Sequence, residues 1–301
     1  MLFSILVSCS FVCFYFILLK IIYYRHSRTS WNKHLFELYR RKAGRSRTCE
    51  NTARNEMCPW QSGHNNSLNE IRALLVTAHP DDECMFFAPT ILRLLQLNAS
   101  VNLLCLSSGN YYNQGVHRQR ELRDSCAVLG IPASQVTIID CKELPDDPKK
   151  EWNIHVISSL ILKQVKASSI NLVLTFDGRG VSGHANHIAI YRSLRYLAST
   201  GEIPDGAGVS PYPTGCCVLS LQTVNVIRKY LSVLELPITW LCRSDVSFLI
   251  GSEEYKQAKR AMFCHRSQLL WFRHLYLLLS RYMFTNTFQV ISQEEKDWKI
   301  Y

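Results

Sequence analysis

The sequence predicts an α/β protein: a three-layer, Rossmann-like domain with a mostly parallel sheet, preceded by one N-terminal transmembrane helix. Three observations support this prediction. After residue 70, short and almost continuously apolar segments alternate with amphipathic helical patterns. Two of these apolar segments are followed directly by loops rich in histidine, aspartate and glycine. The first 24 residues are apolar and precede a strongly basic segment. Alternation of strands and helices is the pattern of a parallel sheet covered on both faces.

Residues 1–24 are predicted to be a membrane anchor. Residues 1–19 carry no charge, Lys20 can extend its amine to the interface, and residues 21–24 lengthen the apolar run to about the twenty residues that span a bilayer. Residues 20–54 hold ten Lys and Arg against two acidic residues. Positive charge stays on the cytoplasmic side, so we expect a lumenal N-terminus and a cytoplasmic body. A cleaved signal peptide is the alternative, but it needs a basic start and a small-residue cleavage site.

The basic charge of the chain is concentrated in one segment. Residues 25–69 are polar, basic and without apolar periodicity, which predicts a partly disordered juxtamembrane linker. The 247 residues after position 54 carry 24 basic and 22 acidic groups. A nucleic-acid-binding protein presents a distributed basic face, so we expect no nucleic-acid partner. With 47% hydrophobic residues, the chain is not disordered as a whole.

Residues 70–290 are predicted to form the folded domain, with residues 291–301 as a C-terminal tail. Strands that are apolar on both faces are typical of a covered parallel sheet. The expected strands are residues 71–78, 101–107, 135–140, 171–176 and 216–221. The expected helices are about 85–97, 117–129, 152–167 and 186–199, the second ending at Gly130. Residues 201–215 are expected to be a loop.

Two further features concern the surroundings of this domain. The cysteines show no C-x-x-C spacing, and several lie in apolar segments, so we expect buried free thiols in a reducing compartment. The apolar run 269–284 is interrupted by two arginines and a histidine and cannot span a bilayer. It either packs as a core helix or lies in the membrane interface.

Polar side chains follow two strands that should be neighbours. His79, Asp81 and Asp82 follow the first strand, and His184 and His187 follow the fourth. With the common strand order 3-2-1-4-5, these loops face each other where the winding direction reverses, which is where ligands bind. His79, Asp82 and His187 would form a metal site with open positions for water and substrate. Asp81 would then be a base for the bound water, and His184 could reach the reacting carbonyl from the opposite side.

The segments AHPDDE and SGHANH, together with SSGNYYNQG and AMFCHRSQLLWFR, resemble the LmbE/PIG-L family of zinc-dependent de-N-acetylases over roughly residues 70–285. The resemblance implies an LmbE-like catalytic domain, Zn²⁺ on His79, Asp82 and His187, Asp81 as general base and His184 as oxyanion stabiliser. It also implies the glycolipid substrate N-acetylglucosaminyl-phosphatidylinositol, deacetylated in the second step of GPI-anchor synthesis at the cytoplasmic face of the endoplasmic reticulum membrane. Two histidines and a carboxylate also suit Fe²⁺ or another divalent metal.

Other assignments keep their alternatives. Arg118 and Glu121 could contact the phosphoinositol, or form an ion pair on a helix surface. His265 could line the pocket, as the resemblance suggests, or cap a helix. A related amide hydrolase acting on another N-acetyl sugar conjugate, or a catalytically silent membrane scaffold, would share this fold. A nucleotide-binding module is disfavoured, because no G-x-G-x-x-G follows the first strand.

Overall fold

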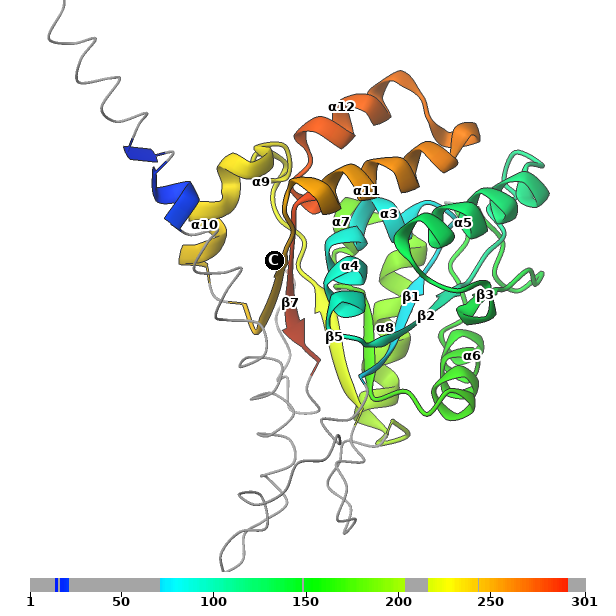
Figure 1. Ribbon diagram of the computed structural model, residues 1–301. Coiled ribbons are helices and arrows are strands. Elements are labelled where there is room, and N and C mark those ends of the chain that lie inside the picture. The colour runs from blue at the N-terminus through cyan, green and yellow to red at the C-terminus, as the bar shows by residue number, and fades with distance from the viewer. Residues whose placement is uncertain are drawn as a thin grey trace, which may run out of the picture.

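The computed structural model describes residues 14–15, 17–21, 71–147, 149–203, 216–242 and 244–291. In this part of the chain, seven strands form one sheet in the order β3-β2-β1-β4-β5-β7-β6. The sheet stands between two layers of helices (Figure 1). The strands are β1 (Arg72–Thr77), β2 (Ser100–Cys105), β3 (Val136–Ile138), β4 (Leu172–Phe176), β5 (Cys217–Leu221), β6 (Val246–Leu249) and β7 (Thr285–Val290).

The first five strands are parallel and confirm the predicted order 3-2-1-4-5. β7 and β6 extend the sheet beyond β5 as an antiparallel edge that the sequence did not predict. The reason lies in β7, whose residues Thr285–Val290 begin with three polar residues and lack the continuous apolar run of the parallel strands. β3 pairs over three residues, which is shorter than expected.

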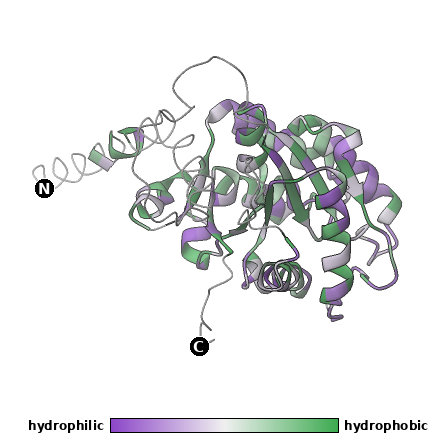
Figure 2. Ribbon diagram, turned by 90° about the horizontal axis from the view of Figure 1, so that it is seen from below, coloured by the Kyte–Doolittle hydropathy of each residue, from purple (hydrophilic) through white to green (hydrophobic). Residues whose placement is uncertain are grey.

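Alternate residues of each central strand pack into different cores, as the two-residue period of a strand requires. On β1, Ala73 and Leu75 belong to one buried cluster, and Leu74 and Val76 to the other. The first cluster lies under α3 (Asp82–Phe86), α4 (Ala88–Gln96), α5 (Gly115–Leu129) and α11 (Ser252–Cys264). The second lies under α6 (Ile154–Ala167) and α8 (Ala185–Ser199). Figure 2 shows the hydrophobic strands in the interior and hydrophilic residues on the outer turns of the helices.

Four predicted helices are present, with one difference. The helix expected at about 85–97 is divided at Phe87, whose backbone is not helical, and Pro89 begins the first turn of α4. Proline suits a first turn, where its missing N–H is not needed. α5 ends as predicted at Gly130, which adopts the left-handed conformation with φ 97°.

Of the remaining elements, α9 (Val226–Lys229), α10 (Leu236–Leu241) and α12 (Trp271–Leu279) lie beyond β5 and β7 on the side of the sheet away from β3 (Figure 1). α12 comes from the apolar run 269–284. Tyr276 and Leu277 of this helix, and Tyr282 and Met283 after it, are buried in the core, whereas Trp271, Leu275 and Leu278 are exposed. The run therefore packs against the core on one side and leaves an apolar side exposed. The short helices are α7 (Gly180–Gly183), α9 (Val226–Lys229), α10 (Leu236–Leu241) and α12 (Trp271–Leu279), with 3₁₀ turns η1 (Ala133–Gln135), η2 (Ser232–Glu235), η3 (Arg266–Gln268) and η4 (Arg281–Met283).

Most of the predicted anchor and all of the predicted linker 25–69 lie outside the described residues, as do 292–301 of the predicted tail and most of the loop 201–215. Residues 14–15 and 17–21 are helical and lie beside α10 (Figure 1). Leu19 packs against Leu236 and Leu249, and the Tyr15 hydroxyl donates to the carbonyl of Leu234. Among the described helices, none combines the length and the apolar character needed to cross a membrane.

Candidate metal-dependent hydrolase site

The loop after β1 is folded by the carboxylate of Asp82. Its Oδ2 accepts hydrogen bonds from the backbone N–H groups of Ala78 (3.0 Å) and His79 (2.9 Å), so the chain turns sharply where the strand ends. The Ser107 hydroxyl, at the end of the neighbouring β2, donates to the carbonyl of Ala78 at 2.8 Å. These contacts leave Oδ1 of Asp82 directed toward β4 and α8. The local sequence therefore builds a turn that presents one carboxylate oxygen.

Asp81 occupies an unusual backbone conformation in this turn. Its φ of 114° lies in a region that side chains rarely adopt, at a cost of about 1–3 kcal/mol that neighbouring contacts must offset. The Asp81 N–H donates to Oε2 of Glu83 at 3.1 Å. Its carboxylate Oδ2 lies 3.3 Å from Nη2 of Arg273 and 4.0 Å from Nη2 of Arg118. Burial raises the pKa of the Asp81 carboxyl above its usual value, although both arginines act in the opposite direction.

The loop after β4 is folded by a second aspartate. Oδ1 of Asp177 accepts from the backbone N–H of Gly180 at 3.1 Å, and Oδ2 accepts from that of Thr223 at 2.7 Å. Gly180 has a φ of +58°, and a Cβ there would lie 3.0 Å from the Cβ of His187. Glycine is therefore required both by the backbone conformation and by the close approach of α8.

The same glycine orients His187. Nδ1 of His187 lies 3.0 Å from the Gly180 carbonyl, which fixes the hydrogen on Nδ1 and leaves a lone pair on Nε2. The ring stacks on Phe176 with a centroid separation of 3.8 Å and an interplanar angle of 7°. Because both contacts come from β4 and the glycine turn, the sequence of this loop fixes the direction of Nε2.

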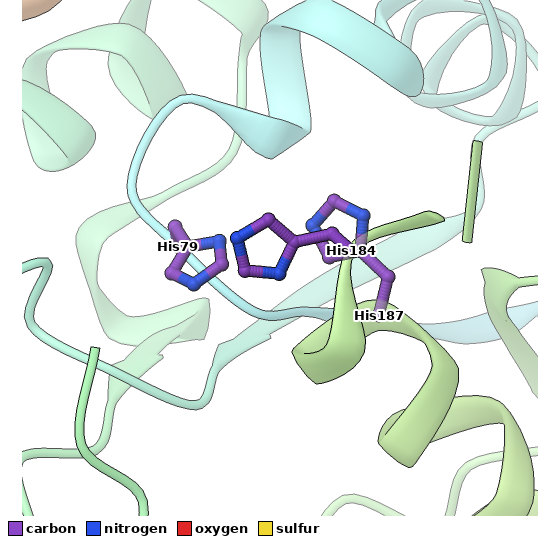
Figure 3. Close-up of side chains that lie close together, drawn as sticks. All are labelled: His79, His184 and His187. Carbon is purple, nitrogen blue, oxygen red and sulfur yellow. The ribbon is translucent and has the colours of Figure 1, made fainter. Parts of the chain in front are cut away.

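The two loops meet at one place, as the strand order predicts. Nε2 of His187 lies 3.2 Å from Oδ1 of Asp82, and Nδ1 of His79 lies 3.8 Å from Oδ2 of the same carboxylate. One ring nitrogen from each of His79, His184 and His187 lies within 4.8 Å of the others. Figure 3 shows His79 entering from the β1 loop and the other two imidazoles from the start of α8.

These residues fit a divalent cation. Nε2 of His187 is buried and has no hydrogen-bond partner, which is costly unless a ligand takes its lone pair. Nε2 of His79 lies 3.2 Å from Oδ1 of Asp146 and 3.0 Å from the amide nitrogen of Asn186, while its Nδ1 faces Asp82. Both imidazoles thus have an acceptor on the nitrogen that points away from Asp82, the arrangement that orients metal-ligating histidines. Burial alone would lower the pKa of His79, but the hydrogen bond and charge of Asp146 raise it. The more basic ring is a better electron-pair donor to a metal ion.

His184 differs from the other two imidazoles. It is half-buried and caps α8, its Nδ1 accepting the Asn186 N–H at 3.3 Å. Burial and the neighbouring His79 and His187 lower its pKa to about 4, so the ring is neutral near pH 7. A neutral ring whose Nδ1 is an acceptor carries its hydrogen on Nε2. His184 therefore offers an N–H donor at the edge of the site, as its predicted role in stabilising the oxyanion requires.

The three predicted substrate-binding residues have separate positions. The buried Arg118 guanidinium donates to the carbonyls of Pro80 (2.7 Å) and Gly109 (3.2 Å) and contacts Asp146, so it borders the site. Glu121 accepts instead from the N–H of Ser267 at 2.8 Å and from its hydroxyl. Arg118 and Glu121 therefore have different partners, and the predicted alternative of an ion pair between them on the helix surface is wrong.

His265 has no exposed surface, unlike a residue that lines a pocket, and it lies at the C-cap of α11, the second of the two predicted alternatives. Its Nε2 lies 2.7 Å from Oε1 of Glu83, which also accepts from the Ser125 hydroxyl. Glu83, His265 and Cys84 lie close enough to form a second possible metal site. Two observations favour a structural role over metal binding: Glu83 and His265 are hydrogen-bonded directly to each other, and burial raises the pKa of the Cys84 thiol. Glu83 also accepts the backbone N–H of Asp81, so the group supports the position of Asp81.

Two residues at the site were missed from the sequence. Asp146 joins His79 and Arg118, and a signal was present, because it follows β3 at the same edge of the sheet. Arg273, which contacts Asp81, had only the signal of interrupting an apolar run. The partner of that arginine depends on how α12 returns over the β1 loop, and no local pattern contains this information.

The sequence is similar to known proteins of one description. The family profile described as GlcNAc-PI de-N-acetylase matches residues 74–198. The N-acetylglucosaminyl-phosphatidylinositol de-N-acetylase of Bos taurus is 53% identical over 216 residues, covering 72% of this chain and 82% of the relative. The Saccharomyces cerevisiae protein of the same description is 30% identical, covering 72% and 80%.

Solved structures share the fold at low sequence identity. The N,N'-diacetylchitobiose deacetylase of Pyrococcus horikoshii matches with a TM-score of 0.51 and 15% identity, over 74% of this chain and 84% of that one. A conserved protein of Thermus thermophilus matches with a TM-score of 0.51 and 16% identity, over 77% and 100%. At these identities the likeness concerns the arrangement of the sheet and helices alone.

Proposed function

The chain belongs to the PIG-L family of GlcNAc-PI de-N-acetylases, and we propose that it hydrolyses the acetamide of N-acetylglucosaminyl-phosphatidylinositol to give acetate and glucosaminyl-phosphatidylinositol. The observation that carries this proposal is the convergence of His79, Asp82 and His187 beside Asp81, in a chain 53% identical to a relative of that description. An amide is a weak electrophile with a poor leaving group, so hydrolysis needs both an activated water and a stabilised oxyanion.

The chain's own residues divide this work. A divalent cation held by His79, Asp82 and His187 would polarise the carbonyl and acidify water. Asp81, whose raised pKa suits proton exchange, takes the proton of the attacking water and delivers it to the departing glucosamine nitrogen. The Nε2–H of His184 donates to the developing oxyanion, a contribution of about 3–4 kcal/mol for a well-placed donor.

We propose Zn²⁺ as the cation. Two imidazole nitrogens and one carboxylate oxygen, with a position left for water, form the usual donor set of a catalytic zinc site. Fe²⁺ accepts the same ligands, so reconstitution of the metal-free protein with each ion decides between them. The expected result is that Zn²⁺ restores acetate release.

The proposed substrate is a lipid, and an exposed apolar face lies on the side of the molecule that carries Arg273. We call the exposed residues of α9, α10 and α12 the apolar face: Val226, Ile227, Trp240, Leu241, Trp271, Leu275 and Leu278. A bilayer surface suits it, because tryptophan with nearby lysine and arginine is typical of the membrane interface. The helical residues 17–21, part of the predicted anchor, pack beside α10. The anchor itself, and a location at the cytoplasmic face of the endoplasmic reticulum, are part of this proposal.

The activity is tested with the purified full chain in mixed micelles containing N-acetylglucosaminyl-phosphatidylinositol. Acetate release is measured before chelation, after chelation and after return of Zn²⁺. The expected result is release that the chelator abolishes and Zn²⁺ restores. Release from a soluble N-acetyl sugar but not from the glycolipid would reassign the substrate, and release that resists the chelator would remove the metal from the mechanism.

The bilayer contact is tested separately in phosphatidylcholine vesicles that contain brominated acyl chains. Trp271 has 74% of its surface exposed on the apolar face, whereas Trp152 has 3% and lies in the core. We expect bromine quenching of tryptophan fluorescence to fall in the Trp271→Phe protein and to persist in the Trp152→Phe control. Equal quenching in the two variants would place α12 away from the bilayer.

A further inference from the structure

Lys229, the last residue of α9, is a partly buried cation beside aromatic rings. Its amine lies over two aromatic rings, 5.6 Å from the centroid of Tyr230 and 5.9 Å from that of Tyr276. The residue is half-buried, and among the described residues it has no salt-bridge partner. Aromatic faces attract a cation, but they replace only part of the hydration that a buried amine loses.

A second cation, Arg273, lies on α12 one turn before Tyr276, one of the two rings beneath the Lys229 amine. Burial, and then the positive charge of Arg273, lower the pKa of Lys229. Nε of Arg273 is itself buried with no hydrogen-bond partner, while Nη2 contacts Asp81. Two like charges in a partly desolvated place repel each other, and an anion bound between them removes that cost. Asp81 faces one side of Arg273, whereas Nε of Arg273 and the Lys229 amine have no anionic partner among the described residues and could share a bound anion.

The residues around this place follow the chemical order of the proposed substrate. Asp81 stands at the reacting end and Arg273 contacts it. The Lys229 amine lies over Tyr276, one turn further along α12, and the exposed Val226 and Ile227 belong to the same short helix as Lys229. In the glycolipid, the acetamide is followed by the glucosamine and inositol rings, then by the phosphodiester, then by the acyl chains. The anionic group of the lipid thus stands at the junction of its polar and apolar parts, and Lys229 stands at the same junction of the protein.

We propose that Lys229 binds the phosphodiester of the glycolipid substrate, with the charge of Arg273 assisting. This inference rests on the proposed function and adds a substrate-binding residue that distinguishes a phosphoinositide from a neutral N-acetyl sugar. The lysine side chain is flexible and ends in a single positive charge, here beside two aromatic rings. Such a group suits a monoanionic phosphodiester, whose oxygens accept hydrogen bonds and need no fixed bidentate partner.

The test compares two substrates in the full chain: N-acetylglucosaminyl-phosphatidylinositol and N-acetylglucosaminyl-inositol, which lacks the phosphodiester. In Lys229→Gln, KM for the glycolipid should rise about tenfold with kcat nearly unchanged, the size of one charge-assisted hydrogen bond. KM for the soluble compound should stay the same. Lys229→Arg should restore most of the affinity. Lys256→Gln, which removes an exposed lysine paired with Glu253 on α11, is the matched control and should behave as wild type.

The outcomes separate this inference from the proposed function. A wild-type protein that releases no acetate from the glycolipid would end the proposed function itself. If the wild type is active but Lys229→Gln leaves the ratio of the two KM values unchanged, the inference alone is overturned. An equal loss on both substrates is one such result, and it would indicate a merely structural lysine. Competition by inorganic phosphate that Lys229→Gln abolishes, without a change in that ratio, would assign the site to free phosphate and also overturn it.

Discussion

Oδ1 of Asp82 lies 3.2 Å from Nε2 of His187, and neither atom has a better partner among the described residues. The remaining polar atoms of both side chains are fixed by backbone: Oδ2 of Asp82 by two N–H groups, and Nδ1 of His187 by the Gly180 carbonyl. Two loops from different strands therefore aim one oxygen and one nitrogen at a common point. This relationship makes the metal the first subject for experiment.

His187→Ala and Asp81→Asn should fail in different ways. Removing the His187 imidazole takes away one ligand, so we expect the purified protein to lose both its bound metal and its acetate release, by more than about 100-fold. Asp81→Asn keeps the ligands and removes the base, so metal content should persist while kcat falls by about 10²–10⁴-fold. Metal analysis and acetate assay on the same preparations make the distinction. Normal turnover in Asp81→Asn would show that another group is the base.

Asp146→Asn tests the support of His79. The carboxylate lies 3.2 Å from Nε2 of His79 and keeps that ring oriented and basic. Its loss should weaken metal affinity or activity by about 10–100-fold, the usual effect of removing a partner behind a metal ligand. Asp147→Asn is the matched control, because Oδ1 of Asp147 only accepts the Lys149 N–H and an amide oxygen can replace it. Equal metal affinity in the two variants would remove Asp146 from the site.

Gly109→Ala should disturb the site through Arg118. Gly109 has a φ of +73°, and a Cβ there would lie 2.7 Å from the Arg118 guanidinium carbon, a contact that forces the side chain to move. We expect at least a tenfold fall in kcat/KM, because Arg118 borders both Asp81 and Asp146. Gly201→Ala is the control: its φ is +70°, yet a Cβ there meets nothing within 4 Å. The left-handed backbone strain, about 1 kcal/mol, is common to both variants.

His265→Gln should destabilise the protein in a pH-dependent way. Burial alone would lower the pKa of His265, but Glu83 raises it, so the stability it contributes is complete below about pH 6.5 and is lost as pH rises through the raised pKa. Burial alone would raise the pKa of Glu83, but His265 lowers it, so its contribution is present above about pH 4.3 and lost in stronger acid.

The variant should therefore lose most stability between about pH 4.3 and 6.5, by about 3 kcal/mol, and less at pH 9. Urea unfolding at pH 6 and at pH 9 measures the difference, with the exposed His155→Gln as control. A loss that is the same at both pH values would contradict a charged pair and indicate simple packing.

Much of the fold could be predicted because its signals are local. Continuous apolar strands, Gly130 at a helix end and the strand–helix alternation each depend on a few neighbouring residues. The strand order then follows from general connection rules, and with it the meeting of the β1 and β4 loops. β7 escaped prediction because its mostly polar sequence lacks the apolar run of the parallel strands, although it lies between β5 and β6 and its first four residues are buried.

The sequence by itself determined which chemical groups are present and which edge of the sheet they occupy: His79 and Asp82 after one strand, His187 after another. Only the tertiary structure decided which nitrogen of each ring faces the carboxylate, that Asp146 contacts His79, and that Arg273 contacts Asp81. The physical reason is range. Turns and strands are set by contacts between near neighbours, whereas ring orientation and the approach of α9 and α12 depend on how distant segments pack.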